Sequence, residues 1–400
     1  MIKTLSLKKG KEEAILRKHP WVFSGALVPF NFTLVDGDVV KLADASKKIV
    51  ATGYYSTGSI AIRILSFNET DIDAKFWINA IQNAFNARLD LGFIDNSETD
   101  CFRLIHGEGD QVSGLIVDIY GKVAIIQCHT IGIYNFLNKI SDAIKKVFDT
   151  RIEAVYSKSA ETLPPEFVRE KNIKNGYIGE QKIDTPYSCI ENGIHFYIDW
   201  VTGQKTGFFL DQRDNRAALS KYVLGKKVLN AFCYSGGFSM YALKAGAEHV
   251  TSVDVSAKAM TLVDENLKLN RFDETKHESI TADVLQFLKE QTAVYDVIII
   301  DPPAFAKSLS KRHNAMQAYT RLNAMAIQAV KSNGFIFTFS CSQVVSTQLF
   351  TDAVMAAAIQ QKRNVRIVAR LTQGADHPVN IFHPEGHYLK GLVLFVSDQD

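Results

Sequence analysis

The sequence has few cysteines for its length, and no two of them have CxxC spacing. Its 400 residues contain five, Cys101, Cys128, Cys189, Cys233 and Cys341. An odd number without that spacing argues against a disulfide framework and against a zinc knuckle. The ten histidines also lack metal-ligand spacing, so the sequence predicts no metal site.

Long hydrophobic runs are missing as well. No window of about 18 apolar residues occurs, as a transmembrane helix would need. The first twenty residues have no apolar core of the signal-peptide type. Together with a cysteine usage that suits a reducing compartment, these features predict a soluble cytoplasmic protein that does not contact a membrane.

A strong charge of one sign is also absent. Lys and Arg number 45 and Asp and Glu number 43, a net charge of +2, which neither indicates nor excludes a nucleic-acid partner. Apolar residues make up 46% and charged residues 22%, which excludes a disordered chain, a collagen and a simple coiled coil. The length predicts two or three domains.

The first half of the chain reads as two small domains. Alternating apolar residues between Gly and Asp predict strands at 38–42, 49–55 and 60–65, and hence a β-rich domain over residues 1–75. Residues 76–198 read as a central α+β domain. Its predicted elements are a helix over 75–92, a hairpin over 114–126 that turns at Tyr120-Gly121, a helix over 134–148, and strands near 153–157 and 186–198.

From residue 199 to 400 the pattern changes to strands that alternate with helices. The first five predicted strands are each followed by a helical stretch, as in a doubly wound, Rossmann-like α/β sheet. Seven strands are predicted in all, at 227–232, 249–254, 279–281, 296–300, 334–340, 364–371 and 390–396.

The first of these strands runs into a turn of small residues. Gly236 and Gly237 end the turn, where glycine permits close approach of a ligand to the backbone. The dinucleotide fingerprint GxGxxG is absent, because Cys233 and Tyr234 occupy the tight part of the turn. A pyrophosphate cradle is therefore not favoured.

Carboxylates follow three successive predicted strands. Asp254 is placed to accept the ribose hydroxyls of an adenosine, Asp283 to meet an adenine amino group, and Asp301 follows the fourth strand. Acidic residues without a phosphate loop suit S-adenosylmethionine, which has no phosphate and carries a sulfonium. The alternative for any one of them is a helix N-cap.

The fourth strand ends in Asp301-Pro302-Pro303, with Phe305 two residues later. The two prolines fix the backbone, so they hold a carboxylate and an aromatic ring at the strand edge where open α/β sheets bind ligands. This pattern indicates methyl transfer to a planar heterocycle or amide.

The fifth strand ends at Ser340-Cys341-Ser342, which we expect beside Asp301. Cytosine C5 is a poor nucleophile, and a thiolate that attacks C6 activates it by covalent catalysis. Cys341 is the candidate nucleophile, provided that its thiolate is favoured or its proton removed. The alternative is a small buried filler, which is our interpretation of Cys233.

These motifs together resemble the bacterial large-subunit ribosomal RNA cytosine-C5 methyltransferase I family, over essentially the whole chain. The matching segments are residues 17–26 (RKHPWVFSGA), 103–108 (RLIHGE), 205–214 (KTGFFLDQRD), 230–238 (NAFCYSGGF), 301–303 (DPP), 339–342 (FSCS) and 375–378 (ADHP).

The resemblance implies an N-terminal PUA domain, a central α+β domain and a methyltransferase domain that uses S-adenosylmethionine on a cytosine of 23S rRNA. It implies Cys341 as nucleophile and Asp301 as a partner of the cytosine ring. The expected cofactor-binding residues are Arg213, Asn230, Phe232, Tyr234, Ser235, Gly236, Gly237, Asp254, Asp283 and Asp301, and the expected substrate-binding residues are Pro302, Pro303 and Phe305.

One departure concerns the wider class of RNA cytosine-C5 methyltransferases. Many carry a second cysteine after the fourth strand, as Pro-Cys, that helps to release the product. Pro302-Pro303 stands at that position here, so release needs another base, Asp301 or a water.

Two other functions stay open at this point. A guanine or adenine N-methyltransferase would use Asp-Pro-Pro without a cysteine, although Phe305 does not directly follow Pro303. An RNA-binding protein with an inactive Rossmann domain is the third candidate, and the intact site residues argue against it.

The partner that the resemblance implies is ribosomal RNA. Residues 1–31 contain six basic and two acidic residues, a local charge of 6 − 2 = +4, so we expect phosphate contacts to begin there. The sequence leaves the oligomeric state open, with a homodimer as one option.

Overall fold

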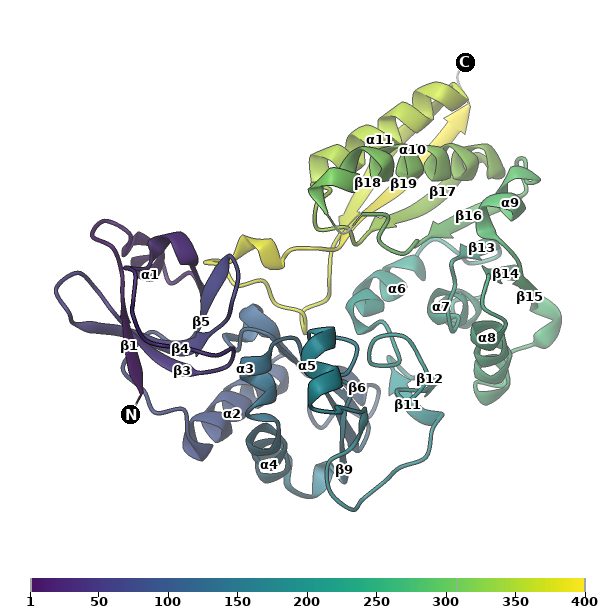
Figure 1. Ribbon diagram of the computed structural model, residues 1–400. Helices are drawn as coiled ribbons and strands as arrows, with labels where there is room; N and C mark the ends of the chain where they lie inside the picture. The colour runs from purple at the N-terminus through teal and green to yellow at the C-terminus, as the bar shows by residue number, and fades with distance from the viewer. Residues whose placement is uncertain (1, 307, 399–400) are drawn as a thin grey trace. The chain divides into compact units, whose positions relative to one another are not determined.

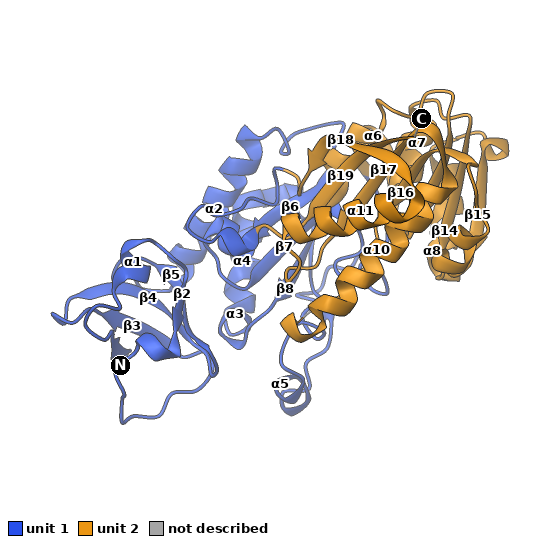
Figure 2. Ribbon diagram, turned by 90° about the horizontal axis from the view of Figure 1, so that it is seen from above, with its two compact units in different colours: residues 1–189, 198–210, 375–386 blue, residues 190–197, 211–374, 387–400 orange. Residues whose placement is uncertain are grey.

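The computed structural model describes residues 2–306 and 308–398, which form two compact units. Figure 2 shows them in blue and orange. The first unit contains residues 1–189, 198–210 and 375–386, and the second contains residues 190–197, 211–374 and 387–400. Among the described residues, no helix has the length and apolar character that would let it cross a membrane.

The N-terminal part of the first unit is a five-stranded sheet in the order β1-β3-β4-β5-β2. Figure 1 shows it in purple, with four of its strands labelled. The three strands predicted there are confirmed, and two short ones join them at the edges. Alternate side chains such as Leu5, Val40 and Ile62 form its own core. The strands are β1 (Lys3–Ser6), β2 (Trp21–Phe23), β3 (Val39–Ala43), β4 (Ile49–Tyr55) and β5 (Ile60–Ser66), with the one-turn helix α1 (Glu13–Leu16).

The central part of the same unit has a second five-stranded sheet, in the order β10-β9-β8-β7-β6. Helix α2 (Ala74–Asp90) begins where the Asp73 side chain accepts the Phe76 N–H. The other elements are β6 (Cys101–His106), β7 (Leu115–Tyr120), β8 (Val123–Cys128), α3 (Ile131–Tyr134), α4 (Leu137–Phe148), β9 (Ala154–Ser157), α5 (Pro165–Glu170) and β10 (Gly176–Tyr177).

Two sequence predictions for this region need correction. The helix predicted over 134–148 is two helices, α3 and α4, which are separated at Asn135 and Phe136. The hairpin turn is Gly121-Lys122 rather than Tyr120-Gly121, because Tyr120 still pairs with Val123 and Gly121 takes the positive φ of 54°.

A two-stranded hairpin follows, β11 (Tyr187–Glu191) and β12 (Ile194–Ile198). The second unit then forms a seven-stranded sheet in the order β15-β14-β13-β16-β17-β19-β18, and all seven predicted strands are confirmed. They are β13 (Lys227–Ala231), β14 (His249–Asp254), β15 (His277–Thr281), β16 (Tyr295–Ile300), β17 (Val330–Ser340), β18 (Arg363–Leu371) and β19 (Lys390–Asp398).

Strands β15, β14, β13, β16 and β17 pair in parallel, whereas β19 runs antiparallel to both β17 and β18. Apolar helix faces cover the two sides of this sheet. One core contains Leu288, Tyr319 and Phe350, and the other contains Leu219 and Phe238. These side chains come from α9 (Val284–Lys289), α10 (Arg312–Ala329) and α11 (Thr347–Gln361), and from α6 (Arg213–Leu219) and α7 (Gly237–Lys244). Helix α8 (Ala257–Leu269) links β14 to β15.

Tyr54 of β4 carries a polar contact into the central part of the first unit. Its side chain is fully buried, and its hydroxyl donates to the Ser113 carbonyl at 2.8 Å and lies 2.9 Å from the Thr130 hydroxyl. Burial raises the pKa of Tyr54, so the hydroxyl keeps its proton and remains a donor.

We expect Tyr54→Phe to lower the free energy of unfolding of the first unit by about 1–2 kcal/mol, because it leaves a buried carbonyl without its donor. Urea unfolding measures this as a lower midpoint with an unchanged slope. Tyr55→Phe, on the same strand but only half-buried, is the matched control. Equal midpoints for the two variants would contradict the assignment.

Candidate active site

The ends of the parallel strands line up at one edge of the seven-stranded sheet. Ala231 of β13 is level with Val253 of β14 and with Ile300 of β16, and Ile300 is level with Thr338 of β17. The residues that directly follow these strands therefore gather at the same edge, as predicted for Asp301 and Cys341.

The turn after β13 has an unusual backbone. Phe232, Tyr234 and Gly236 all take positive φ values, 60°, 47° and 80°. The Asp254 carboxylate accepts the Tyr234 N–H at 3.0 Å, and the Asn266 side chain donates to the Ser235 carbonyl at 3.0 Å. These contacts offset the strain of a left-handed conformation in residues other than glycine.

Two features of this turn suit a bound ligand. The Ser235 hydroxyl is buried and has no hydrogen-bond partner in the described structure, and such a group is costly unless something completes it. A Cβ on Gly237 would lie 3.0 Å from Cδ of Arg216, so a side chain at this position would have to displace the arginine by a few tenths of an ångström. Asn230, at the end of β13, supports the turn by donating to Ser239 at 2.8 Å.

The three carboxylates occupy different surroundings. Asp254 is half-buried, and its oxygens accept the N–H groups of Tyr234 and Ser256. Asp301 is half-buried, and its Oδ2 accepts the Gln212 amide at 2.9 Å. Asp283 is exposed, and its Oδ1 accepts the Gln286 N–H at 2.9 Å. It is therefore the N-cap of α9, which was the alternative interpretation of this residue.

Arg213, the first residue of α6, lies next to a buried carboxylate that sequence reasoning missed. Glu191 is fully buried and accepts two hydrogen bonds from Arg216 at 2.8 and 2.7 Å, and one from Tyr241 at 3.0 Å. Nε of Arg213 lies 3.5 Å from the same carboxylate. Glu191 thus ties β11 to α6 and α7.

Cys341 is the only half-exposed cysteine among the five, and the other four are buried. Burial raises the pKa of Cys128 to about 12, and it raises those of Cys189 and Cys233 well above the usual value. These three thiols are therefore held in the unreactive protonated form.

A lysine lies beside Cys341 on the neighbouring strand. Lys390 pairs with Ser340 across β17 and β19, and its ammonium donates to the Ser342 carbonyl at 2.7 Å. Burial lowers the pKa of Lys390 to about 8, although a negative charge on Cys341 acts to raise it. The sequence signal for it was a lysine that opens an otherwise apolar strand.

The serines beside Cys341 are held by Tyr319 of α10. Ser340 donates to the Tyr319 hydroxyl at 2.9 Å, and that hydroxyl lies 3.2 Å from the Ser342 hydroxyl. The Phe305 ring packs against Tyr319 with ring centroids 4.7 Å apart. Pro302 is buried and Pro303 is exposed, so of the two prolines only Pro303 presents its ring to solvent.

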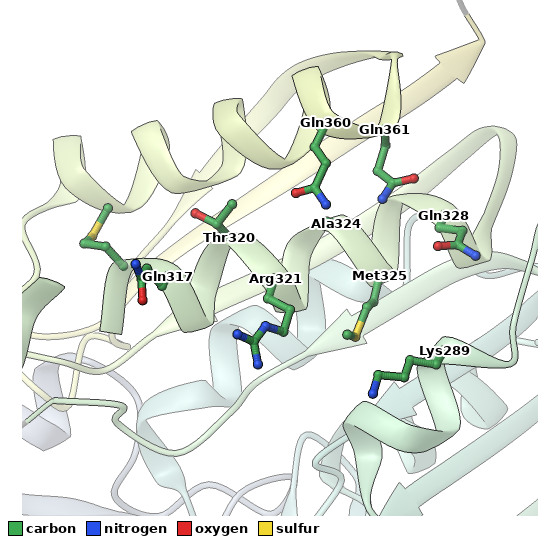
Figure 3. Close-up of a pocket in the computed structure, with 10 residues that line it drawn as sticks. Lys289, Gln317, Thr320, Arg321, Ala324, Met325, Gln328, Gln360 and Gln361 are labelled. Carbon is green, nitrogen blue, oxygen red and sulfur yellow. The ribbon is translucent and has the colours of Figure 1, made fainter. Parts of the chain in front are cut away.

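A separate pocket of about 620 Å³ lies between helices α9, α10 and α11, and side chains from these three helices line it (Figure 3). Lys289 reaches it from α9, Arg321 and Gln328 from α10, and Gln360 from α11. None of the predicted site residues lines it, so the strand edge remains the candidate site.

The residues at the strand edge fit S-adenosylmethionine. A tight small-residue turn, an unpartnered buried hydroxyl at Ser235 and the Asp254 carboxylate suit a phosphate-free adenosine ligand. When bound, this cofactor supplies an electrophilic methyl group. Asp254 would hold the ribose and Ser235 would complete a hydrogen bond.

We expect Asp254→Asn to weaken binding of S-adenosylmethionine at least about tenfold, because the amide loses a negative charge and an acceptor for the ribose hydroxyls. Isothermal titration calorimetry measures the change. The control is Asp273→Asn, which caps the short 3₁₀ turn at Glu274–Lys276, away from the strand edge. Equal affinities would rule out the ribose role of Asp254.

Comparison with known proteins supports this interpretation of the site. Residues 171–379 match the family of S-adenosylmethionine-dependent methyltransferases, and residues 5–67 match the PUA-like domain family. The chain is 37% identical over 399 residues to ribosomal RNA large subunit methyltransferase I of Alteromonas mediterranea, with 98% of each chain covered. It is 36% identical to the protein of the same name from Tolumonas auensis, with 98% of this chain and 99% of that protein covered.

Solved structures share the fold. A protein from Streptococcus mutans assigned as a SAM-dependent methyltransferase superposes with a TM-score of 0.82 at 24% identity, covering 99% of this chain and all of that one. A second structure, of a protein described as a methyltransferase in complex with S-adenosylhomocysteine (SAH), gives a TM-score of 0.83 at 24% identity, with the same coverage. S-adenosylmethionine is the cofactor of these enzymes. The chain belongs to the ribosomal RNA large subunit methyltransferase I family, S-adenosylmethionine-dependent enzymes with an N-terminal PUA-like domain.

Proposed function

We propose that this protein methylates C5 of a cytosine in large-subunit ribosomal RNA. The observation that carries the proposal is Cys341, the one half-exposed cysteine, at the end of a strand that pairs with the strand preceding Asp301. The relatives are named for methylation of large-subunit rRNA, and a thiol nucleophile at this edge suits cytosine among the bases.

In the proposed reaction, the Cys341 thiolate adds to C6 of the cytosine, and the C5–C6 electron pair becomes available at C5. The bound cofactor would supply the methyl group to C5, with S-adenosylhomocysteine as the leaving group. A base then removes the C5 proton, and the electrons re-form the C5–C6 double bond as the S–C6 bond breaks. We assign the contact with the cytosine ring to Asp301, which the Gln212 amide orients at 2.9 Å.

No second cysteine is present at this strand end to assist release of the product, because Pro302-Pro303 follows Asp301. The Asp301 carboxylate or a water at the same edge would therefore take the C5 proton. The two prolines hold the carboxylate in place during the reaction by restricting the backbone.

The target base must leave its stack to reach this edge, as other base-modifying enzymes require. We propose that residues 1–75 are an RNA-binding PUA-like domain, residues 76–198 a central domain and residues 199–400 the catalytic domain. The match of residues 5–67 to PUA-like domains supports the first assignment. Six basic side chains in residues 1–31 are exposed and available to phosphates, Lys3, Lys8, Lys9, Lys11, Arg17 and Lys18.

We expect Cys341→Ala to abolish formation of 5-methylcytosine, with a loss of about 10³-fold or more, while binding of S-adenosylmethionine is unchanged. Nucleoside mass spectrometry of rRNA methylated in vitro measures the product, and calorimetry measures cofactor binding. Cys101→Ala, a buried cysteine of β6, is the control. Full activity of Cys341→Ala, or a methyl group on a guanine or adenine nitrogen, would instead support the N-methyltransferase alternative.

Lys390 gives a second test of the same site, because its positive charge favours the Cys341 thiolate. The pKa of Lys390 is about 8. Its ammonium form therefore predominates below that pH, and the support is lost as the pH rises through it. We expect Lys390→Met to slow alkylation of Cys341 by iodoacetamide below about pH 8 and to change it little above.

Lys390→Arg keeps the charge and should restore the alkylation rate. Lys331→Met, which removes a lysine that pairs with Asp296 on the same sheet, controls for loss of a charge elsewhere. If Lys390→Met were alkylated at the original rate below pH 8, Lys390 would have no part in activating Cys341.

A further inference from the structure

Two histidines and a glutamate from opposite ends of the chain meet in the first unit. The Oε2 atom of Glu385 lies 3.9 Å from Nε2 of His19 and 3.8 Å from Nε2 of His383. One ligand atom from each of the three side chains lies within 4.8 Å of the other two. No pattern in the sequence pointed to this cluster, because the residues are far apart in the chain.

The backbone around His19 is well held. Its N–H donates to the Ala14 carbonyl at 2.9 Å, which closes the loop between α1 and β2. Its Nδ1 lies 3.2 Å from both the Trp21 carbonyl and the Trp21 N–H, so its role as donor or acceptor depends on the tautomer. In the tautomer with the proton on Nδ1, the ring donates to the carbonyl and Nε2 is left to bind a metal, an arrangement common in metal sites.

The segment with His383 and Glu385 is anchored in the same unit. Arg88 donates to the Asp376 carbonyl at 3.0 Å, and the Arg103 N–H donates to the Asp376 carboxylate at 2.9 Å. Further along, the Asn380 side chain donates to the Glu108 carbonyl at 3.1 Å, and the His383 N–H donates to the Asn380 carbonyl at 2.8 Å. The backbone that carries His383 and Glu385 is therefore fixed in the first unit by hydrogen bonds that do not involve either side chain.

His383 itself is incompletely bonded. Its residue is 3% exposed, and neither ring nitrogen has a hydrogen-bond partner in the described structure. The Trp21 ring packs against the imidazole edge to face, with centroids 4.3 Å apart. A buried imidazole without a partner is costly, and an ion bound to one of its nitrogens would supply the missing partner.

We propose that Nε2 of His19, Nε2 of His383 and a carboxylate oxygen of Glu385 bind a Zn²⁺ ion. Two histidines and one carboxylate are a common donor set for tetrahedral zinc, with water as fourth ligand. Bonds of about 2.0–2.1 Å put tetrahedral ligand atoms about 3.4 Å apart, so the two measured pairs close by about half an ångström on binding. Glu385 is more than half exposed, which leaves the ion a path from solvent.

The ion would fasten the segment of residues 375–386 to the N-terminal sheet. That segment belongs to the first unit, yet it connects strands β18 and β19 of the second. The Trp21 ring, which packs against His383, is itself held in place because its indole N–H donates to Glu108 at 2.9 Å. The role is structural and is independent of the methyl transfer proposed above.

The test uses the full chain without an affinity tag, stripped with a chelator and titrated with Zn²⁺ by isothermal titration calorimetry. We expect one equivalent to bind, and Glu385→Gln and His19→Gln each to weaken that binding at least about tenfold. Both side chains are partly exposed, so both variants should fold. His195→Ala removes an exposed histidine of β12 and should bind as the unaltered chain does.

Two further readings separate this site from zinc binding elsewhere. Zn²⁺ should raise the melting temperature of the unaltered chain and of His195→Ala but not that of Glu385→Gln. Co²⁺ should give the visible absorption of a tetrahedral ion in the unaltered chain and in His195→Ala but not in Glu385→Gln. The proposal is overturned if no Zn²⁺ binds, or if Glu385→Gln and His19→Gln bind it with the original affinity, which would place the ion elsewhere in the chain.

Discussion

The hydrogen-bonded ion pair between Glu191 and Arg216 is the interaction on which the packing of α6 and α7 in the second unit depends. The Glu191 carboxylate is fully buried, and it accepts hydrogen bonds from Arg216 of α6 and Tyr241 of α7. Burial works against the charge of Arg216, but the charge and hydrogen bonds of Glu191 outweigh it, so the pKa of Arg216 is raised. Loss of one partner from such a pair costs about 3–5 kcal/mol, because the other is left as an uncompensated buried charge.

This pair lies next to the turn after β13. Helix α7 begins at Gly237, where a Cβ would lie 3.0 Å from Cδ of Arg216. The arginine that Glu191 holds therefore packs against this turn, and glycine fits there without displacing it. Asp254 supports Tyr234, one of the left-handed residues of the turn, by accepting its N–H.

Much of this unit could be read from the sequence. The seven strands of the sheet were predicted because short apolar runs bounded by polar turns, alternating with helical stretches, mark the strands of an α/β sheet. The order of residues at the strand ends then placed Asp301 and Cys341 together without any coordinates. The errors lay in the first unit and were local: Asn135 and Phe136 interrupt a helix that periodicity predicted as continuous, and Tyr120 belongs to a strand rather than to its turn.

The sequence by itself determined the fold of the sheet, the strand-end carboxylates and the candidate nucleophile, because these depend on local patterns and on the regular geometry of parallel strands. Only the tertiary structure decided the partners of Glu191, the lysine beside Cys341, and the meeting of His19 with His383 and Glu385. Each of these pairs residues that are distant in the chain. A side chain's distant neighbours follow from the packing of whole elements, and no local pattern of residues records that packing.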